Sequence, residues 1–257
     1  PAAIDTLPSR RGDSPNSKIK DMERIEYRDV IDKSQWGDGP WQSEPDKIQW
    51  QDEATGLPCL IVRGPVGALC GYVGVPQTHP AYGLHYDGCT TEAAEEWSKE
   101  SRSRMEKARR NPTGPRIMPD FSDMPERTVV PGVGEAVAAL EAHGGLTFAD
   151  ACTDTSYEAW LAWRGRLTAR ADEAKQYPVG DAARAFEEWG GCLDSYQAWL
   201  GRAHARFVCH SDPGNDQVWW FGFDCAHAWD LNPGMRAYSL REPSPDEVYR
   251  DVAYVTK

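Results

Sequence analysis

The stretch that decides the fold is WWFGFDCAHAWD, residues 219–230, near the C-terminal end of the chain. Its first five residues are apolar enough for a buried strand, and Asp224, Cys225, His227 and Asp230 follow in quick succession. Polar groups at the end of such a strand are costly to bury unless other groups pair with them. The stretch therefore predicts a buried strand that leads directly into a polar site.

Working outward, further apolar segments predict the rest of a small sheet. Residues 57–63 and 69–75 are strand-like and are joined by GPVG, which is typical of a hairpin. Residues 207–210 and 217–224 predict a second hairpin around the turn-forming sequence SDPGND. We expect the two hairpins to meet in one mostly antiparallel sheet, because motifs on both carry the polar residues.

The region between the hairpins, about 91–206, is predicted to be a helical insertion. Residues 91–110 begin with Thr91, a good N-cap, and have acidic residues early and basic residues late, as the helix dipole favours. Residues 134–142 predict a short apolar helix that ends at a His-Gly-Gly sequence.

The pattern SYxAWL occurs twice, at 156–161 and at 195–200, an offset of 195 − 156 = 39 residues. In each copy the Tyr, Trp and Leu side chains fall on one face of a helix. We expect two similar helices within 155–207 that pack through their aromatic faces. The alternative is a pair of arginine-lined aromatic grooves that bind a ligand.

These elements predict an α+β fold: a small, mostly antiparallel sheet with an inserted helical block. A length of 257 residues allows one domain with a substantial core. We assign residues 50–257 to this domain, with the helical insertion at about 91–206. Residues 1–49 are rich in polar residues without a sustained period, and we interpret them as an N-terminal arm and lead-in.

The composition restricts the function. Forty acidic residues against 28 basic ones give a net charge of −12, which argues against direct nucleic-acid binding. Seven cysteines without a CxxC pair indicate reduced thiols. There is no apolar run long enough for a membrane span and no signal sequence, so we expect a cytoplasmic protein that binds no membrane. The 11 tryptophans predict aromatic packing.

Histidines and carboxylates recur in three motifs. His85 and Asp87 are two residues apart, so they share a face of an extended segment. Asp224, His227 and Asp230 are spaced by three. His143 precedes two glycines, where backbone can approach a ligand closely. If these residues converge, they form a mixed His/carboxylate set suited to zinc, manganese or iron.

From this set we predict a metal-assisted hydrolase acting on a small molecule or nucleotide. The metal ligands are His85, Asp87, Asp224 and His227. Catalysis is assigned to Asp224, His227 and His143, with a spare carboxylate as general base. Ligand contacts are assigned to Tyr82, Trp220 and Asp230.

Other interpretations stay open at this point. The same residues suit a metal-free catalytic pocket, or polar networks that only stabilise the fold. A Cys225/His227 nucleophile pair is a further option, although the sequence shows nothing that lowers the thiol pKa. From a different class, the chain is a non-enzymatic protein that binds a host factor through its acidic surface or its aromatic helices. The sequence does not indicate an oligomeric state.

The motifs GYVGVP (71–76) followed by HPAYGLHYD (79–87), HGGLTF (143–148), WWFGFDCAHA (219–228) and YRDVAYV (249–255) resemble a family of uncharacterised bacteriophage and prophage proteins. The resemblance spans roughly residues 50–257. It implies a phage origin and location in the host cytoplasm, and it implies no reaction. It also implies a Gly at the position of Trp229, so the turn before Asp230 departs from the family pattern.

Overall fold

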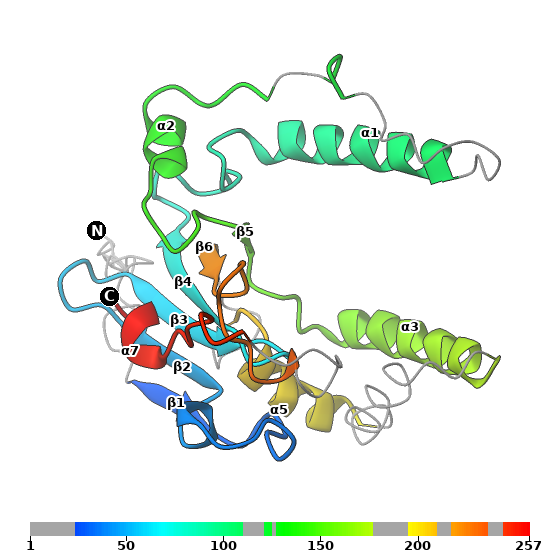
Figure 1. Ribbon diagram of the computed structural model, residues 1–257. Helices are drawn as coiled ribbons and strands as arrows, with labels where there is room; N and C mark the ends of the chain where they lie inside the picture. The colour runs from blue at the N-terminus through cyan, green and yellow to red at the C-terminus, as the bar shows by residue number, and fades with distance from the viewer. Residues whose placement is uncertain (1–23, 110–120, 125–126, 177–194, 210–216, 236–243) are drawn as a thin grey trace, which may run out of the picture.

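The computed structural model describes residues 24–109, 121–124, 127–176, 195–209, 217–235 and 244–257. A six-stranded sheet lies at its centre, in the order β1-β2-β3-β4-β6-β5, and each neighbouring pair is antiparallel (Figure 1). The strands are β1 (Ile25–Tyr27), β2 (Lys47–Gln51), β3 (Pro58–Arg63), β4 (Leu69–Pro76), β5 (Phe148–Ala151) and β6 (Val218–Asp224). The α+β prediction and the antiparallel sheet are confirmed.

Helices surround the sheet and extend away from it. The α-helices are α1 (Thr91–Arg109), α2 (Val133–Ala138), α3 (Tyr157–Gln176), α5 (Tyr196–Arg206) and α7 (Val252–Val255), and η2 (Pro40–Gln42) is a 3-10 turn. The helices predicted at 91–110 and 134–142 are therefore confirmed, the second ending earlier than expected. Among the described helices, none has the length and apolar character needed to cross a membrane.

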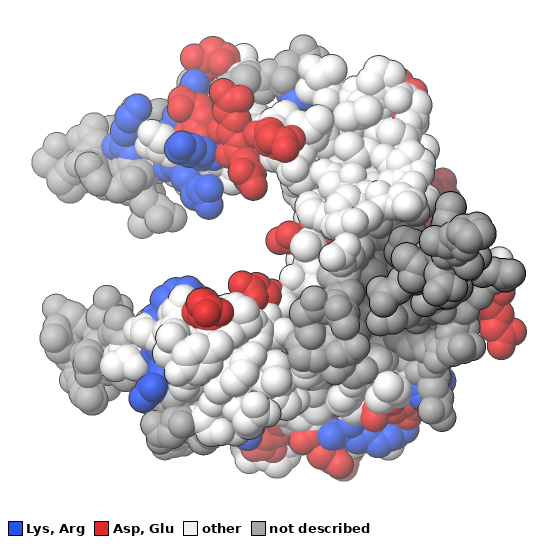
Figure 2. Space-filling view, turned by 180° about the vertical axis from the view of Figure 1, so that it is seen from behind, with Lys and Arg blue, Asp and Glu red and all other residues white. Residues whose placement is uncertain are grey.

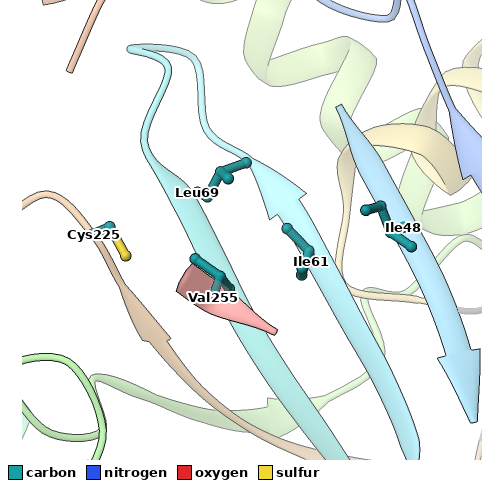
Figure 3. Close-up of a cluster of buried hydrophobic side chains, with 5 residues drawn as sticks. All are labelled: Ile48, Ile61, Leu69, Cys225 and Val255. Carbon is teal, nitrogen blue, oxygen red and sulfur yellow. The ribbon is translucent and has the colours of Figure 1, made fainter. Parts of the chain in front are cut away.

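The predicted first hairpin forms β3 and β4, with Ile61 opposite Gly71. All six residues of β3 are buried, because this strand lies in the middle of the sheet and both of its faces are covered. On one face, Ile48, Ile61 and Leu69 pack with Cys225 and with Val255 of α7 (Figure 3). This contact holds the C-terminal helix against the sheet.

The opposite face of the sheet packs against the segment that follows α5. Leu60, Val62 and Trp220 are buried there together with Val208. Because side chains alternate along a strand, Leu60 and Val62 point to this face while Ile61 points to the other. The continuous apolar run in β3 thus supplies both halves of the core.

The second predicted hairpin is wrong in its first strand. Residues 207–209 form bends rather than a strand, and His210 lies outside the described residues. The buried Lys47 ammonium donates hydrogen bonds to the backbone carbonyls of His204, Phe207 and Cys209. Those carbonyls therefore satisfy a charge at the end of α5 instead of pairing in the sheet. Strand β6 pairs with β4 and β5.

The lead-in and the helical insertion both contribute strands that the sequence analysis did not predict. Strands β1 and β2 begin within residues 1–49, so the domain boundary placed at residue 50 cuts through the sheet. Strand β5 lies within the predicted insertion and pairs along β6, with Phe148 opposite Gly222. The insertion is therefore not wholly helical.

The two SYxAWL copies begin α3 and α5, as predicted. Ser156 and Ser195 each accept a hydrogen bond from the backbone N–H three residues later, which is the N-cap arrangement. Trp160 and Trp199 are 4% and 2% exposed and lie in one cluster with Ala203. The two tryptophans are buried by the packing between the helices and are not open to a ligand, whereas Tyr157 stays 51% exposed.

Helices α1 and α3 extend from the sheet toward the same side (Figure 1). From behind, they form two arms on either side of a wide hollow (Figure 2). The arm that contains α1 carries both acidic and basic side chains, in keeping with its sequence. The excess of negative charge is therefore not gathered on this arm as a patch of one sign.

Candidate functional site

The antiparallel register separates the residues that the sequence analysis placed in one metal site. Pro76, at the end of β4, lies opposite Val218, whereas Asp224, at the end of β6, lies opposite Cys70. Six residues of strand, about 20 Å, lie between the two ends. The His85 segment is held at the first end, where Trp219 Nε1 donates to the Leu84 carbonyl. The predicted ligand set of His85, Asp87, Asp224 and His227 is therefore wrong.

A different set does assemble at the second end. The side chains of His143, His227 and Asp230 each place one donor atom within 4.8 Å of the others. His143 lies just before β5, and His227 and Asp230 lie in the turn after β6. Because β5 and β6 are paired, the HGG motif is brought beside the end of the deciding stretch. The expected convergence of His143 with His227 and Asp230 occurs here.

Asp230 is the centre of this group, and its side chain is only 1% exposed. Its Oδ2 lies 2.7 Å from His143 Nε2 and accepts from the backbone N–H of His227 at 3.0 Å. Its Oδ1 accepts from Arg250 Nε at 2.9 Å. Burial disfavours the charged form, but the hydrogen bonds from His143 and Arg250 outweigh burial and hold the pKa of Asp230 below its ordinary value.

His143 is fixed from both sides of its ring. Its Nε2 meets Asp230, and its Nδ1 lies 2.8 Å from the hydroxyl of Tyr254 in α7. A hydroxyl can either donate to Nδ1 or accept from it, so Tyr254 supports both neutral tautomers of the imidazole. The Arg250 guanidinium lies 4.9 Å from the centre of the Tyr254 ring. Residues of the C-terminal segment thus hold the group in place.

His227 packs against the glycines that follow His143. Gly144 has φ of +71°, and a Cβ at this position would lie 2.6 Å from Cε1 of the His227 ring. The rings of His143 and His227 are 5.2 Å apart and meet edge to face. The sequence analysis expected the backbone at the HGG motif to approach a ligand; in the structure the close neighbour of the Gly144 backbone is the His227 ring.

Gly144→Ala should therefore destabilise the protein more than Gly145→Ala. Both glycines have positive φ, so each alanine variant should lose about 1 kcal/mol of unfolding free energy. Only at residue 144 does the new methyl group collide with His227, which should cost about 1–3 kcal/mol more. Urea denaturation of both variants measures the difference. Equal losses would show that the backbone of Gly144 does not constrain the His227 ring.

His85 and Asp87 belong to a second group, which is completed by Cys89. Asp87 Oδ1 lies 2.7 Å from His85 Nδ1 and 2.9 Å from Cys89 Sγ, and its Oδ2 lies 2.5 Å from Arg127 Nη1. Burial and the Asp87 carboxylate raise the pKa of the Cys89 thiol to about 11. A guanidinium already neutralises the carboxylate, and the thiol stays protonated. This group is better explained as a polar network that stabilises its loop.

The remaining predicted residues lie outside both groups. Asp224 accepts from Thr147 Oγ1 and from the backbone N–H of Ala226, each at 2.9 Å. The Tyr82 ring packs 5.9 Å from that of Trp219, at the His85 end of the sheet. Trp220 is fully buried in the core, so it is placed where no ligand can contact it. The assignment of Trp220 to ligand contact is wrong.

The Cys225/His227 nucleophile pair is not supported by the geometry. Cys225 is 2% exposed and packs in the core beneath α7. Burial, together with the nearby Asp230 carboxylate, raises the pKa of its thiol to about 12. A protonated, buried thiol is inert as a nucleophile at neutral pH.

Sequence reasoning missed Arg250 and Tyr254 as members of the site. Both lie in the segment YRDVAYV (249–255), which the sequence analysis had quoted as a motif without assigning it to the site. The motif itself was the signal that could have identified these two residues. Its local pattern does not show that the segment returns to the end of β6. The return is made by the bridge between Asp230 and Val248 and by the packing of α7 on the sheet.

The fold and the site together define an α+β protein with a His/His/Asp group at the edge of an antiparallel sheet. Comparison of the chain with protein-family models, with curated proteins and with solved structures found no match in any of the three. We therefore infer the function from the geometry of the site.

Proposed function

We propose that this protein is a metal-assisted hydrolase in which His143, His227 and Asp230 hold the metal. One observation carries the proposal. His227 Nδ1 is buried and makes no hydrogen bond within the described part of the chain, yet it faces Asp230 Oδ2 at 3.7 Å. That separation is too long for a hydrogen bond and close to the spacing of two ligands that share one cation at about 2.0–2.2 Å.

The surroundings of the three residues suit metal ligation. Without a metal, His143 Nε2 donates its proton to Asp230. Once Nε2 binds a metal, Tyr254 can accept the Nδ1 proton and keep the imidazole neutral. Arg250 holds Oδ1 of Asp230, so Oδ2 can bind a cation while it still accepts from the His227 backbone N–H. Two imidazoles and one carboxylate are suited to zinc, manganese or ferrous iron. Three protein ligands leave a position for water or substrate.

Such a metal would lower the pKa of a bound water and polarise the bond to be cleaved. The chain itself supplies the proton-handling groups. Asp224 is outside the ligand group and stays our candidate general base, because each of its oxygens accepts a single hydrogen bond from the part of the chain that the structure describes. The Tyr254 hydroxyl, on a side chain that is 38% exposed, is placed to exchange a proton with His143.

The phage origin and the host cytoplasm as the site of action remain part of the proposal, supported by the motif resemblance. The alternative, a non-enzymatic protein that binds a host factor, has no specific observation in its favour. The tryptophans of its aromatic helices are buried against each other, and the α1 arm carries mixed charges.

The proposal is tested by hydrolysis of generic chromogenic esters. Bis(4-nitrophenyl) phosphate and 4-nitrophenyl acetate should be offered to the metal-stripped protein and to protein reloaded with zinc, manganese or ferrous iron. We expect turnover of at least one ester only after reloading, and a loss of about a hundredfold or more in His227→Ala. Absence of turnover in every reloaded form, with no metal retained, would refute the hydrolase.

A further inference from the structure

Trp229, between the two metal-site residues of the C-terminal turn, is unusual in both backbone and exposure. Its φ is +76°, in the left-handed region that favours glycine, and its side chain is 64% exposed. The backbone N–H of Asp230 bonds to the His227 carbonyl, so Trp229 occupies the third position of a tight turn. Glycine is the usual residue at such a position when φ is positive.

Packing does not explain why a tryptophan is kept in this strained turn. An indole that is mostly exposed gains little from burial, whereas the left-handed backbone costs free energy. The turn is fixed on both sides, because the Trp229 carbonyl accepts from the backbone N–H of Val248 at 2.8 Å. A strained backbone beside a candidate site, under a ring that is left mostly exposed, points to a role in binding. A large exposed ring is suited to stacking on another ring.

Arg250 offers a binding group for an anion at the same site. Its Nε donates to Asp230 and its guanidinium lies over the Tyr254 ring. Its two terminal nitrogens make no hydrogen bond within the described residues, and 27% of the side chain is exposed. A guanidinium with open donors is suited to a phosphate, which it can bind through two parallel hydrogen bonds.

We propose that the site takes a nucleoside phosphate, with the base stacked on Trp229 and the phosphate bound by Arg250. The inference deepens the proposed hydrolase by naming its substrate class. A divalent metal and Arg250 together would outweigh the two negative charges of Asp230 and Asp224, so the loaded site would be positive on a chain of net charge −12. Neutral esters and peptides would gain nothing from that local charge.

The test is calorimetric titration with adenosine monophosphate, adenosine and ribose 5-phosphate, on metal-free and zinc-loaded protein. We expect the monophosphate to bind more tightly than either fragment. Trp229→Gly should weaken the monophosphate and adenosine by about tenfold and leave ribose 5-phosphate unchanged. Trp229→Phe should retain most of the affinity, because an aromatic ring remains.

The melting temperature distinguishes a binding role of Trp229 from a purely structural one. Glycine relieves the positive φ, so the binding role predicts that Trp229→Gly raises Tm by about 2–4 °C while it weakens binding. With a purely structural role, the loss of Trp229 would not weaken binding in a more stable protein. Arg250→Lys, which keeps the charge but loses the fork of donors, should weaken the monophosphate and ribose 5-phosphate but not adenosine.

The outcomes separate this inference from the proposed function. If the protein retains metal but neither form binds the monophosphate in a way that depends on Trp229, the nucleotide inference is overturned and the proposed hydrolase is unaffected. If the monophosphate binds through Trp229 to a protein that holds no metal, the nucleotide site is supported and the proposal of a metal-assisted hydrolase is overturned. Monophosphate binding equal to that of ribose 5-phosphate also overturns the inference.

Discussion

Asp230→Ala is expected to abolish metal binding and to destabilise the protein by about 3 kcal/mol. The change removes one metal ligand and leaves Arg250, His143 and the His227 backbone N–H without their shared acceptor. Breaking a buried ion pair costs about 3–5 kcal/mol, and the lower end applies because Arg250 is partly exposed. Elemental analysis and urea denaturation of chelator-free preparations measure the two effects.

Asp224→Ala is the matched control. Asp224 is the last residue of β6, just before the turn that contains Asp230, but it lies outside the group of His143, His227 and Asp230. This variant should retain metal at the wild-type stoichiometry. If Asp224→Ala loses the metal and Asp230→Ala keeps it, the assignment of ligands is wrong.

The same carboxylate should give the protein an acid-sensitive component of stability. The pKa of Asp230 is depressed in the folded state, so its contribution is complete above the unfolded value of about 4. The contribution is lost as pH falls through the lower, folded value. Metal-free Asp230→Asn should therefore show a shallower loss of stability below about pH 4 than the metal-free wild type.

Arg63→Met is expected to lower the unfolding free energy by about 3–5 kcal/mol. The Arg63 side chain is fully buried, and its nitrogens donate to Asp46, Glu44 and the Tyr249 hydroxyl as well as to two backbone carbonyls. Methionine fills similar volume but leaves these acceptors unpaired. Urea denaturation followed by tryptophan fluorescence measures the loss.

Arg24→Ala is the control for a charge that the fold does not bury. Arg24 pairs with Glu26 at 3.0 Å, but its side chain is 49% exposed. Surface pairs of this kind contribute little, so the variant should stay within about 0.5 kcal/mol of the wild type. A loss in Arg63→Met as small as that in Arg24→Ala would mean that the Arg63 network does not tie residues 44–46 to the C-terminal segment.

The elements that the sequence predicted correctly have strong local signals. The hairpin of β3 and β4 has two apolar runs around a Gly-Pro turn, and α3 and α5 begin at serine caps. Strand β1 has only three residues, too few for a recognisable period. Strand β2, KIQWQ, alternates polar and apolar residues but is too short and polar to predict that Lys47 and Gln49 are buried. A polar residue buried against its neighbours cannot be recognised from its own type.

The candidate site was predicted in part. His143, His227 and Asp230 were each singled out from their motifs, and the three do meet. Their combination with His85 and Asp87 failed because residues that follow two antiparallel strands lie at opposite ends of the sheet. The relative direction of two strands is set by pairing between segments that are far apart in the sequence, and a local pattern does not contain that information.

The most direct test of the account is anomalous diffraction from crystals of the protein loaded with zinc. The account predicts one strong peak between His143 Nε2, His227 Nδ1 and Asp230 Oδ2, with the His143 Nδ1 still bonded to Tyr254. A peak at His85, Asp87 and Cys89 instead, or no peak at either group, would contradict the proposed metal centre.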